Sequence, residues 1–129
     1  MKDDATVPGV ITAAAWSVVF FGYYLVMLGL GLVFVPNLML RCFLQPPTNE
    51  PWLRVLGIVA TVLGCYYVAA GWGTAMVFIR ATIWGRAVGA ASFSLLVVLG
   101  IAPKFILVMA AVDAAGAFYT WYLLRLERR

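Results

Sequence analysis

One carboxylate stands out in this sequence because it falls inside a long apolar stretch. Residues 105–124 lie between Lys104 and Arg125 and contain a single charged side chain, Asp113. About twenty apolar residues in a helix are enough to cross the hydrocarbon core of a bilayer. A charged group at that depth is costly, so Asp113 is a candidate proton-coupling or ligand-binding residue.

Small side chains are predicted to surround Asp113. The three-and-four spacing of a helical face gives it the neighbours Met109, Ala110, Gly116, Ala117 and Thr120. We therefore expect Asp113 to face another helix or a narrow cavity, about 13 Å below the outer boundary at about 1.5 Å per residue. Ser92 is expected at the same level, with Tyr23 or Tyr24 within reach from the first helix.

Three interpretations of Asp113 stay open. In the structural one it is neutral or hydrogen-bonded to tyrosine and serine, and ties the last helix to the bundle. In the functional one it couples a proton or holds a ligand, and Arg86, expected about a turn and a half deeper, reaches it with its long side chain. Contact with another subunit is a third use. A lone acid supplies no acid–base pair and no nucleophile–base arrangement is visible, so an enzyme is the least supported class.

The composition indicates a chain that is covered by lipid. Apolar residues make up 65% and charged residues 11%, against about half and about a quarter in soluble domains. The net charge of +4 comes from basic residues at segment ends, which is the membrane pattern and predicts no nucleic-acid partner. There is no His, Cys42 and Cys65 lie in different segments, and the five carboxylates do not cluster. We expect no metal, no cofactor and no thiol–disulfide relay.

The apolar segments predict an all-α fold in one integral membrane domain, residues 1–129. The predicted spans cover about 12–34, 52–70, 74–99 and 105–124, with a short interfacial amphipathic helix at about 37–44. The apolar run from Val7 to Val35 is too long for a signal-peptide core and is interpreted as a retained helix. Residues 71–73, with two glycines, are expected to form the turn between the second and third spans.

Small residues recur every seven positions in the first two spans. They are Ala15, Gly22 and Gly29 in the first, and Gly57, Gly64 and Gly71 in the second. Matching seams of this kind predict a tight antiparallel hairpin, because small side chains let helices approach closely in lipid. The G-x-x-x-G pair Gly85 and Gly89 predicts another close contact in the third span, whose Arg80 and Arg86 are expected to reach toward headgroups.

The first loop carries a second group of polar residues. Arg41, Asn49, Glu50 and Arg54 are candidates for binding a lipid headgroup or a partner. Capping of the next helix by Thr48 or Asn49 explains much of this cluster without function. The basic residues place both chain ends in the cytoplasm: Lys2, Arg80, Arg86, Arg125, Arg128 and Arg129 lie on one side, and Arg41, Arg54 and Lys104 on the other.

The layout resembles small bacterial four-helix membrane proteins of the DoxX-like kind. The likeness rests on Pro36-Asn37 after the first span, on the segment 46–57 that leads into the second, and on Asp113 in the fourth. It implies a four-helix fold in a bacterial inner membrane and little about chemistry. Small multidrug transporters carry an acid in the first helix, and quinone-linked disulfide enzymes carry cysteine pairs; neither feature is present here.

The sequence favours a non-enzymatic membrane protein that binds a lipid-like or small apolar molecule between helices, or an accessory subunit of a larger membrane complex. The alternative is a proton-coupled transporter that works as a homo-oligomer with Asp113 as the coupling group. Membrane lipid is the expected partner in either case.

Overall fold

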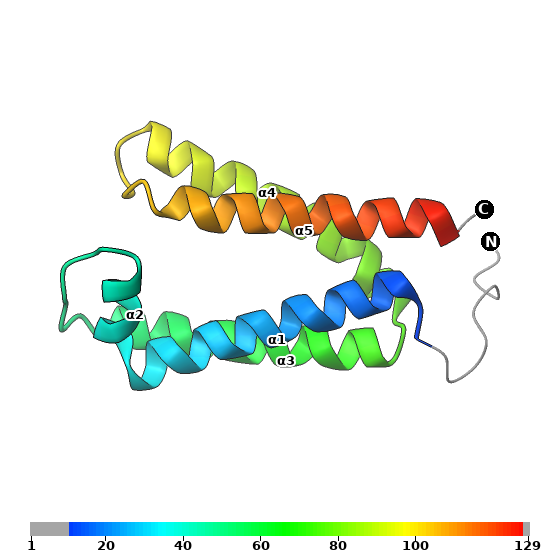
Figure 1. The fold of residues 1–129 in the computed structure, drawn as a ribbon, viewed down its shortest axis with the longest axis horizontal. Coiled ribbons are helices and arrows are strands. Elements are labelled where there is room, and N and C mark those ends of the chain that lie inside the picture. The colour runs from blue at the N-terminus through cyan, green and yellow to red at the C-terminus, as the bar shows by residue number, and fades with distance from the viewer. Residues whose placement is uncertain (1–10, 128–129) are drawn as a thin grey trace. The chain divides into compact units, whose positions relative to one another are not determined.

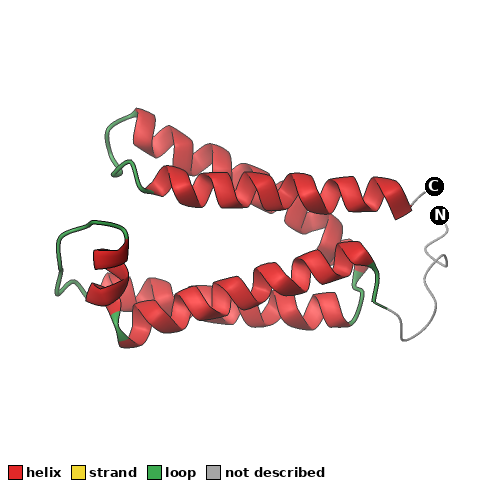
Figure 2. Ribbon diagram, viewed as in Figure 1, coloured by secondary structure: helices red, strands yellow, loops and turns green. Residues whose placement is uncertain are grey.

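A computed structural model describes residues 11–127. Its helices are α1 (Ala13–Phe34), α2 (Pro36–Cys42), α3 (Trp52–Trp72), α4 (Met76–Val98) and α5 (Ile106–Glu127) (Figure 1). No strand occurs within the described residues (Figure 2), so the predicted all-α fold is confirmed. Lys2, Val7, Arg128 and Arg129, which entered the arguments above, lie outside the described part of the chain.

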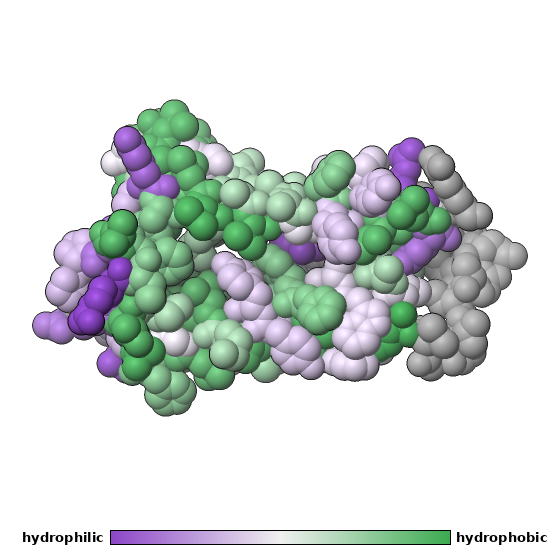
Figure 3. All heavy atoms as spheres, in the orientation of Figure 1, coloured by the Kyte–Doolittle hydropathy of each residue, from purple (hydrophilic) through white to green (hydrophobic). Residues whose placement is uncertain are grey.

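Four of the helices, α1, α3, α4 and α5, are long and apolar enough to cross a membrane. Many of their large apolar side chains are exposed; Val77 and Val98 on α4 are 84% and 80% exposed. Such extended apolar surface is unfavourable in water and suits lipid. Figure 3 shows apolar residues over most of the visible helix surface and strongly hydrophilic residues mainly near the helix ends.

Three helices end in the same way, with a residue of positive φ that lets the chain turn back. These residues are Leu44 after α2 (φ 59°), Thr74 after α3 (φ 48°) and Gly100 after α4 (φ 77°). In each case the next N–H reaches the carbonyl five residues earlier, as in Ile101 N–H to the Leu96 carbonyl at 2.9 Å. This is the Schellman arrangement, which satisfies carbonyls left open at a helix end.

The turn between α3 and α4 therefore differs from the expected position. Gly71 is still helical and α3 continues through Trp72. The turn is made by Gly73 and Thr74, with the Thr74 N–H donating to the Gly71 carbonyl at 3.0 Å. The expectation was wrong by about two residues because it placed the helix end at the first glycine of the pair, whereas the left-handed position is taken by Thr74.

The chain divides into two compact units. One, called here the α4–α5 unit, contains α4, α5, the end of α3 from Ala70 and the start of α1 through Val18. The other, the α1–α3 unit, runs from Val19 to Ala69 and contains the rest of α1, α2 and most of α3. Each unit is described separately.

Glycines bring α1 and α3 into backbone contact within the α1–α3 unit. A Cβ at Gly22 would lie 2.8 Å from the Gly64 carbonyl oxygen, and one at Gly64 would lie 2.7 Å from the Gly22 carbonyl oxygen. Gly29 and Gly57 form the same reciprocal pair one heptad further along, at 2.5 and 2.7 Å. The predicted antiparallel hairpin is confirmed at these four glycines, where no other residue fits without moving a helix.

Polar bonds fix the end of this hairpin. The Arg54 side chain at the start of α3 donates to the Val33 carbonyl near the end of α1, a favourable place for a cation at the negative end of a helix dipole. The Asn37 side-chain oxygen on α2 accepts from the Thr48 N–H at 2.9 Å. The Thr48 hydroxyl accepts from the Glu50 N–H at 3.1 Å, ahead of α3 rather than inside its first turn.

Candidate functional site: a buried polar cluster in the α4–α5 unit

Arg86 is the most deeply buried charged residue described. It lies ten residues into α4, about 15 Å along the helix, and its side chain is only 3% exposed. One terminal nitrogen donates to the Thr120 hydroxyl on α5 at 2.8 Å. Two longer contacts of 3.4 Å join Arg86 to the carbonyl and the hydroxyl of Thr82, one turn earlier. The expectation that Arg86 extends toward headgroups is therefore wrong, because the side chain is held between α4 and α5.

A chain of hydrogen bonds leads away from Arg86 to the start of α1. The Thr120 hydroxyl, which accepts from Arg86, lies 2.8 Å from the Ser17 hydroxyl. Ser17 donates to the Ala14 carbonyl at 2.6 Å. Each hydroxyl has one proton, so Thr120 is the donor to Ser17. All donors in the chain thus point away from the guanidinium, the direction in which a cation polarises them.

This chain of hydrogen bonds ends near a second charged residue, Glu127. Glu127, in the last turn of α5, accepts from the backbone N–H of Ala14 at 2.9 Å. A carboxylate at this place satisfies a donor left open at the start of α1 and lies at the positive end of its dipole. Glu127 is thus the last residue of α5 and caps another helix. Ser17 and Thr120 thus lie between a cation and an anion.

Asp113 lies on α5, half-buried, on the side that faces α4. A Cβ at Gly89 would come 3.3 Å from one of its carboxylate oxygens, and no other atom would come within 4 Å of that position. Asp113 also interacts electrostatically with Arg86. The carboxylate therefore occupies space that the absent side chain of Gly89 leaves open between α4 and α5.

The structure does not place Ser92, Tyr23 or Tyr24 in contact with Asp113 among the interactions of the described residues. Ser92 lies on an exposed face of α4. Tyr23 and Tyr24, which are 47% and 37% exposed, belong to the α1–α3 unit, where the ring of Tyr24 lies 5.6 Å from that of Phe21. Approach of either tyrosine to Asp113 stays a prediction.

The G-x-x-x-G pair of α4 behaves differently at its two positions. Gly89 lies against Asp113, but a Cβ at Gly85 would meet nothing within 4 Å and the residue is exposed. The expected close helix contact at Gly85 is therefore absent within the described residues. The spacing alone could not distinguish a glycine against another helix from one that faces outward.

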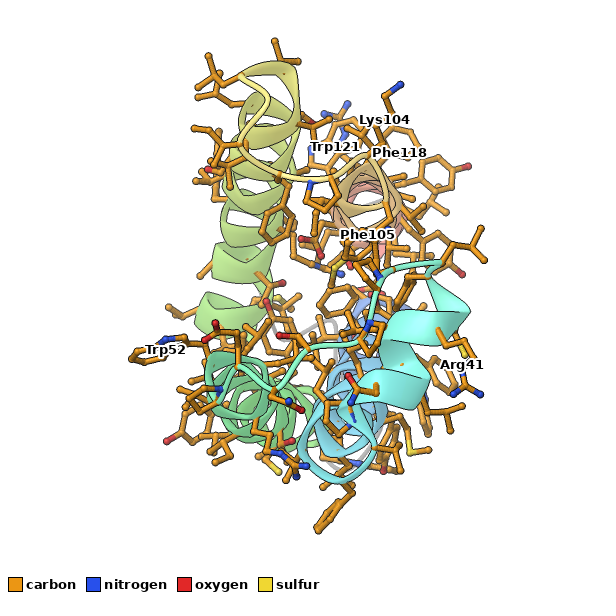
Figure 4. The ribbon with its side chains drawn as sticks, turned by 90° about the vertical axis from the view of Figure 1, so that its left-hand side faces the viewer. Arg41, Trp52, Lys104, Phe105, Phe118 and Trp121 are labelled. Atoms are coloured by element: carbon orange, nitrogen blue, oxygen red, sulfur yellow. The ribbon has the colours of Figure 1, made fainter. Side chains whose placement is uncertain are left out.

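The candidate headgroup residues of the first loop stay on the surface of the α1–α3 unit. Arg41, Asn49, Glu50 and Arg54 are all exposed, and in Figure 4 the Arg41 side chain extends outward from α2. Arg54 is engaged at the Val33 carbonyl. Within the described residues no hydrogen bond joins any two of these four side chains, so they do not form a common site.

Aromatic side chains and a basic residue lie together near the C-terminal end of α5. Figure 4 labels Phe118 and Trp121 on this helix. Their rings are 5.8 Å apart, and the Arg125 guanidinium lies 5.0 Å from the centre of the Trp121 ring. Exposed tryptophan with a basic residue is typical of the membrane–water interface. Lys104, at the other end of α5, points away from the helix in Figure 4.

Four members of the cluster were not predicted as site residues: Ser17, Thr82, Thr120 and Glu127. A signal was present, because Asp113, Thr120 and Glu127 are spaced by seven and share one face of α5. The sequence carries no comparable signal for Ser17, because its place in the cluster depends on which helix packs beside α5.

The described residues contain no group of three potential metal ligands from His, Cys, Asp and Glu. No protein-family model matches the chain, and no curated protein or solved structure is significantly similar to it. The arrangement of Arg86, its hydroxyl partners Thr82 and Thr120, and Asp113 is therefore interpreted from its own chemistry. It provides a cation, a carboxylate and hydroxyls inside otherwise apolar helices, which suits binding of a polar group better than a covalent reaction.

Proposed function

We propose that this protein is a non-enzymatic integral membrane protein that binds a lipid-like small molecule, with the polar end of that molecule at Arg86. The observation that supports this most directly is the burial of Arg86 within a membrane-spanning helix. Intramembrane charges are costly and usually serve substrates, ions or ligands. Large exposed apolar side chains on α4 and α5, among them Val88 and Phe118, suit contact with an aliphatic tail.

Native mass spectrometry from a mild detergent tests this proposal. We expect the wild-type protein to retain a small amphiphile as a discrete mass increment, and Arg86→Gln to lose it. Arg41→Gln, which removes an exposed charge on α2, is the matched control and should retain it. A wild-type protein that carries no such increment, even after incubation with total lipid extract, would contradict ligand binding. The same spectra report subunit number, and so test the accessory-subunit form of the proposal.

A second candidate, proton-coupled transport by a homo-oligomer, is favoured by the half-buried carboxylate of Asp113, which lies against Gly89 of α4 within the apolar helices. A carboxylate that alternates between its charged and neutral forms changes the charge balance at Arg86 and could couple a proton to a solute. In proteoliposomes, transport requires that Asp113→Asn abolishes flux while the folded protein remains. A purely structural acid would change thermal stability without changing any flux.

The proposal includes a bacterial inner-membrane location with both chain ends in the cytoplasm, and a likeness in layout to DoxX-like proteins. The orientation is supported by the distribution of the basic residues along the sequence: without the buried Arg86, five lie on the side of the chain ends and three on the other.

A further inference from the structure

The short helix α2 lies at the bilayer surface because of its place in the chain. It begins at Pro36, two residues after α1 ends at Phe34, and the next helix long enough to cross a membrane, α3, begins at Trp52. Its seven residues extend about 10 Å, which is too short to cross a bilayer. None of these residues is buried. A short exposed helix between two spans belongs at the level of the lipid headgroups.

Contacts within the α1–α3 unit fix which side of α2 faces outward. A Cβ at Gly31 of α1 would lie 2.7 Å from the Met39 sulfur, so the Met39 side of α2 packs on α1. Arg41 is two residues further on, about 200° around the helix, and is exposed. Its side chain extends outward from α2 in Figure 4. Within the described residues its guanidinium has no hydrogen-bond or ion-pair partner.

Leu44 places an apolar side chain beside this cation. The Leu44 N–H donates to the Arg41 carbonyl at 3.0 Å, so the two residues are one turn apart. The Leu44 side chain is 91% exposed, and its φ of 59° lies in the left-handed region, which favours glycine. A leucine in this conformation and with this exposure is unfavourable in water. The same side chain is stabilised where it enters the boundary between headgroups and acyl chains.

The surroundings of α2 indicate that lipid covers it. Phe34, the last residue of α1, and Trp52, the first residue of α3, are each 72% exposed. The apolar surface that the two spans present to lipid therefore continues to both sides of α2. Leu38 on α2 itself is 52% exposed. A lipid in contact with these side chains has its headgroup at the level of Arg41.

We propose that Arg41 and Leu44 form a binding surface for an anionic phospholipid, here called the α2 surface. The guanidinium of Arg41 binds the lipid phosphate, a charge-assisted pairing that arginine favours, and Leu44 contacts the upper part of an acyl chain. Anionic headgroups attract basic residues near a membrane surface, so a lipid with a net negative charge is preferred over a zwitterionic one. This inference is independent of the ligand proposed at Arg86.

Native mass spectrometry of the full-length protein with two added phospholipids tests the α2 surface. Dioleoylphosphatidylglycerol is the anionic probe, and dioleoylphosphatidylcholine, with the same acyl chains, is the zwitterionic control. Offered both in equal amounts, the wild-type protein is expected to retain more phosphatidylglycerol. Arg41→Gln should lower the ratio of retained phosphatidylglycerol to phosphatidylcholine by about fivefold, the effect of one basic residue near a membrane surface.

Matched variants separate the α2 surface from general effects. Lys104→Gln removes an exposed cation from the loop between α4 and α5 and should lower the ratio by less than about twofold. Leu44→Gly keeps the left-handed turn and should lower retention of both lipids by about tenfold through loss of the apolar contact, without lowering stability in SDS titration. Thr74→Gly relieves the same conformation after α3 and should retain both lipids.

Each contrary outcome overturns a defined part of the inference. Equal losses in Arg41→Gln and Lys104→Gln would show that net charge alone attracts the lipid. Unchanged retention in Leu44→Gly would remove the apolar contact, and no wild-type preference for phosphatidylglycerol would remove the anionic headgroup. If another part of the chain covers α2, neither variant changes the lipids retained. The ligand proposed at Arg86 differs in mass from both probes and stays bound in Arg41→Gln, so failure here is distinct from failure of the proposed function.

Discussion

The close approach of α1 and α3 predicts that one added methyl group will separate them. In Gly64→Ala the new Cβ would lie 2.7 Å from the Gly22 carbonyl oxygen and 2.8 Å from the Val26 backbone nitrogen. The first distance is about 0.7 Å shorter than the 3.4 Å at which ordinary van der Waals contact begins. Because both atoms belong to the backbone, no change of side-chain rotamer relieves the overlap. We expect Gly64→Ala to lower the free energy of unfolding by about 1–3 kcal/mol.

Unfolding of the purified protein by SDS titration in mixed micelles, followed by circular dichroism, measures this change. Gly85→Ala is the control, since its Cβ would meet nothing within 4 Å and should change the free energy by less than about 0.5 kcal/mol. Gly22→Ala should resemble Gly64→Ala, because the overlap is reciprocal. Equal stability of Gly64→Ala and Gly85→Ala would refute the packing of α1 against α3 described here.

Three further predictions concern the cluster and the orientation of the chain. Glu127→Ala should lower the free energy of unfolding by about 1 kcal/mol through loss of the bond to the Ala14 N–H. Glu127→Gln keeps an acceptor and should lower the free energy of unfolding less. Equal losses in the two variants would show that the bond to Ala14 does not contribute to stability. Thr120→Val should cost about 2 kcal/mol by leaving a guanidinium donor without its partner, while Thr120→Ser should be close to wild type in the same titration. In intact cells an impermeant maleimide should label Cys42, the last residue of α2, and leave Cys65, within α3, unlabelled. The opposite orientation predicts no labelling of Cys42 until the cells are opened.

The parts of the fold that follow from local periodicity could be predicted. The heptad spacing of Gly22 and Gly29 against Gly57 and Gly64 indicates an antiparallel pair, because residues seven apart share a helical face and small residues mark the face in contact. The structure has this pairing. The positions of the spans follow from the length of the apolar runs, which the bilayer thickness fixes.

The cluster could be predicted only in part, because it depends on which helices are neighbours. Asp113 is conspicuous as a charge in an apolar run, but Ser17 becomes relevant only when the start of α1 lies beside α5. The expected position of Arg86 near the headgroups failed for the same reason: a long side chain at that level can extend to the interface or into the bundle, and the Thr120 hydroxyl on another helix favours the bundle. Gly85 shows the converse, since its spacing matches a packing motif without a helix against it.

The central claim is that Arg86 and Asp113 form an interacting pair of charges within the membrane-spanning helices. A double-mutant cycle with Arg86→Gln, Asp113→Asn and the combined variant, measured by SDS unfolding, tests it most directly. The pair should show a coupling free energy of about 1 kcal/mol or more, with the double variant more stable than the sum of the single losses predicts. Losses that add to within about 0.3 kcal/mol would show that the two residues act independently, and would contradict the account.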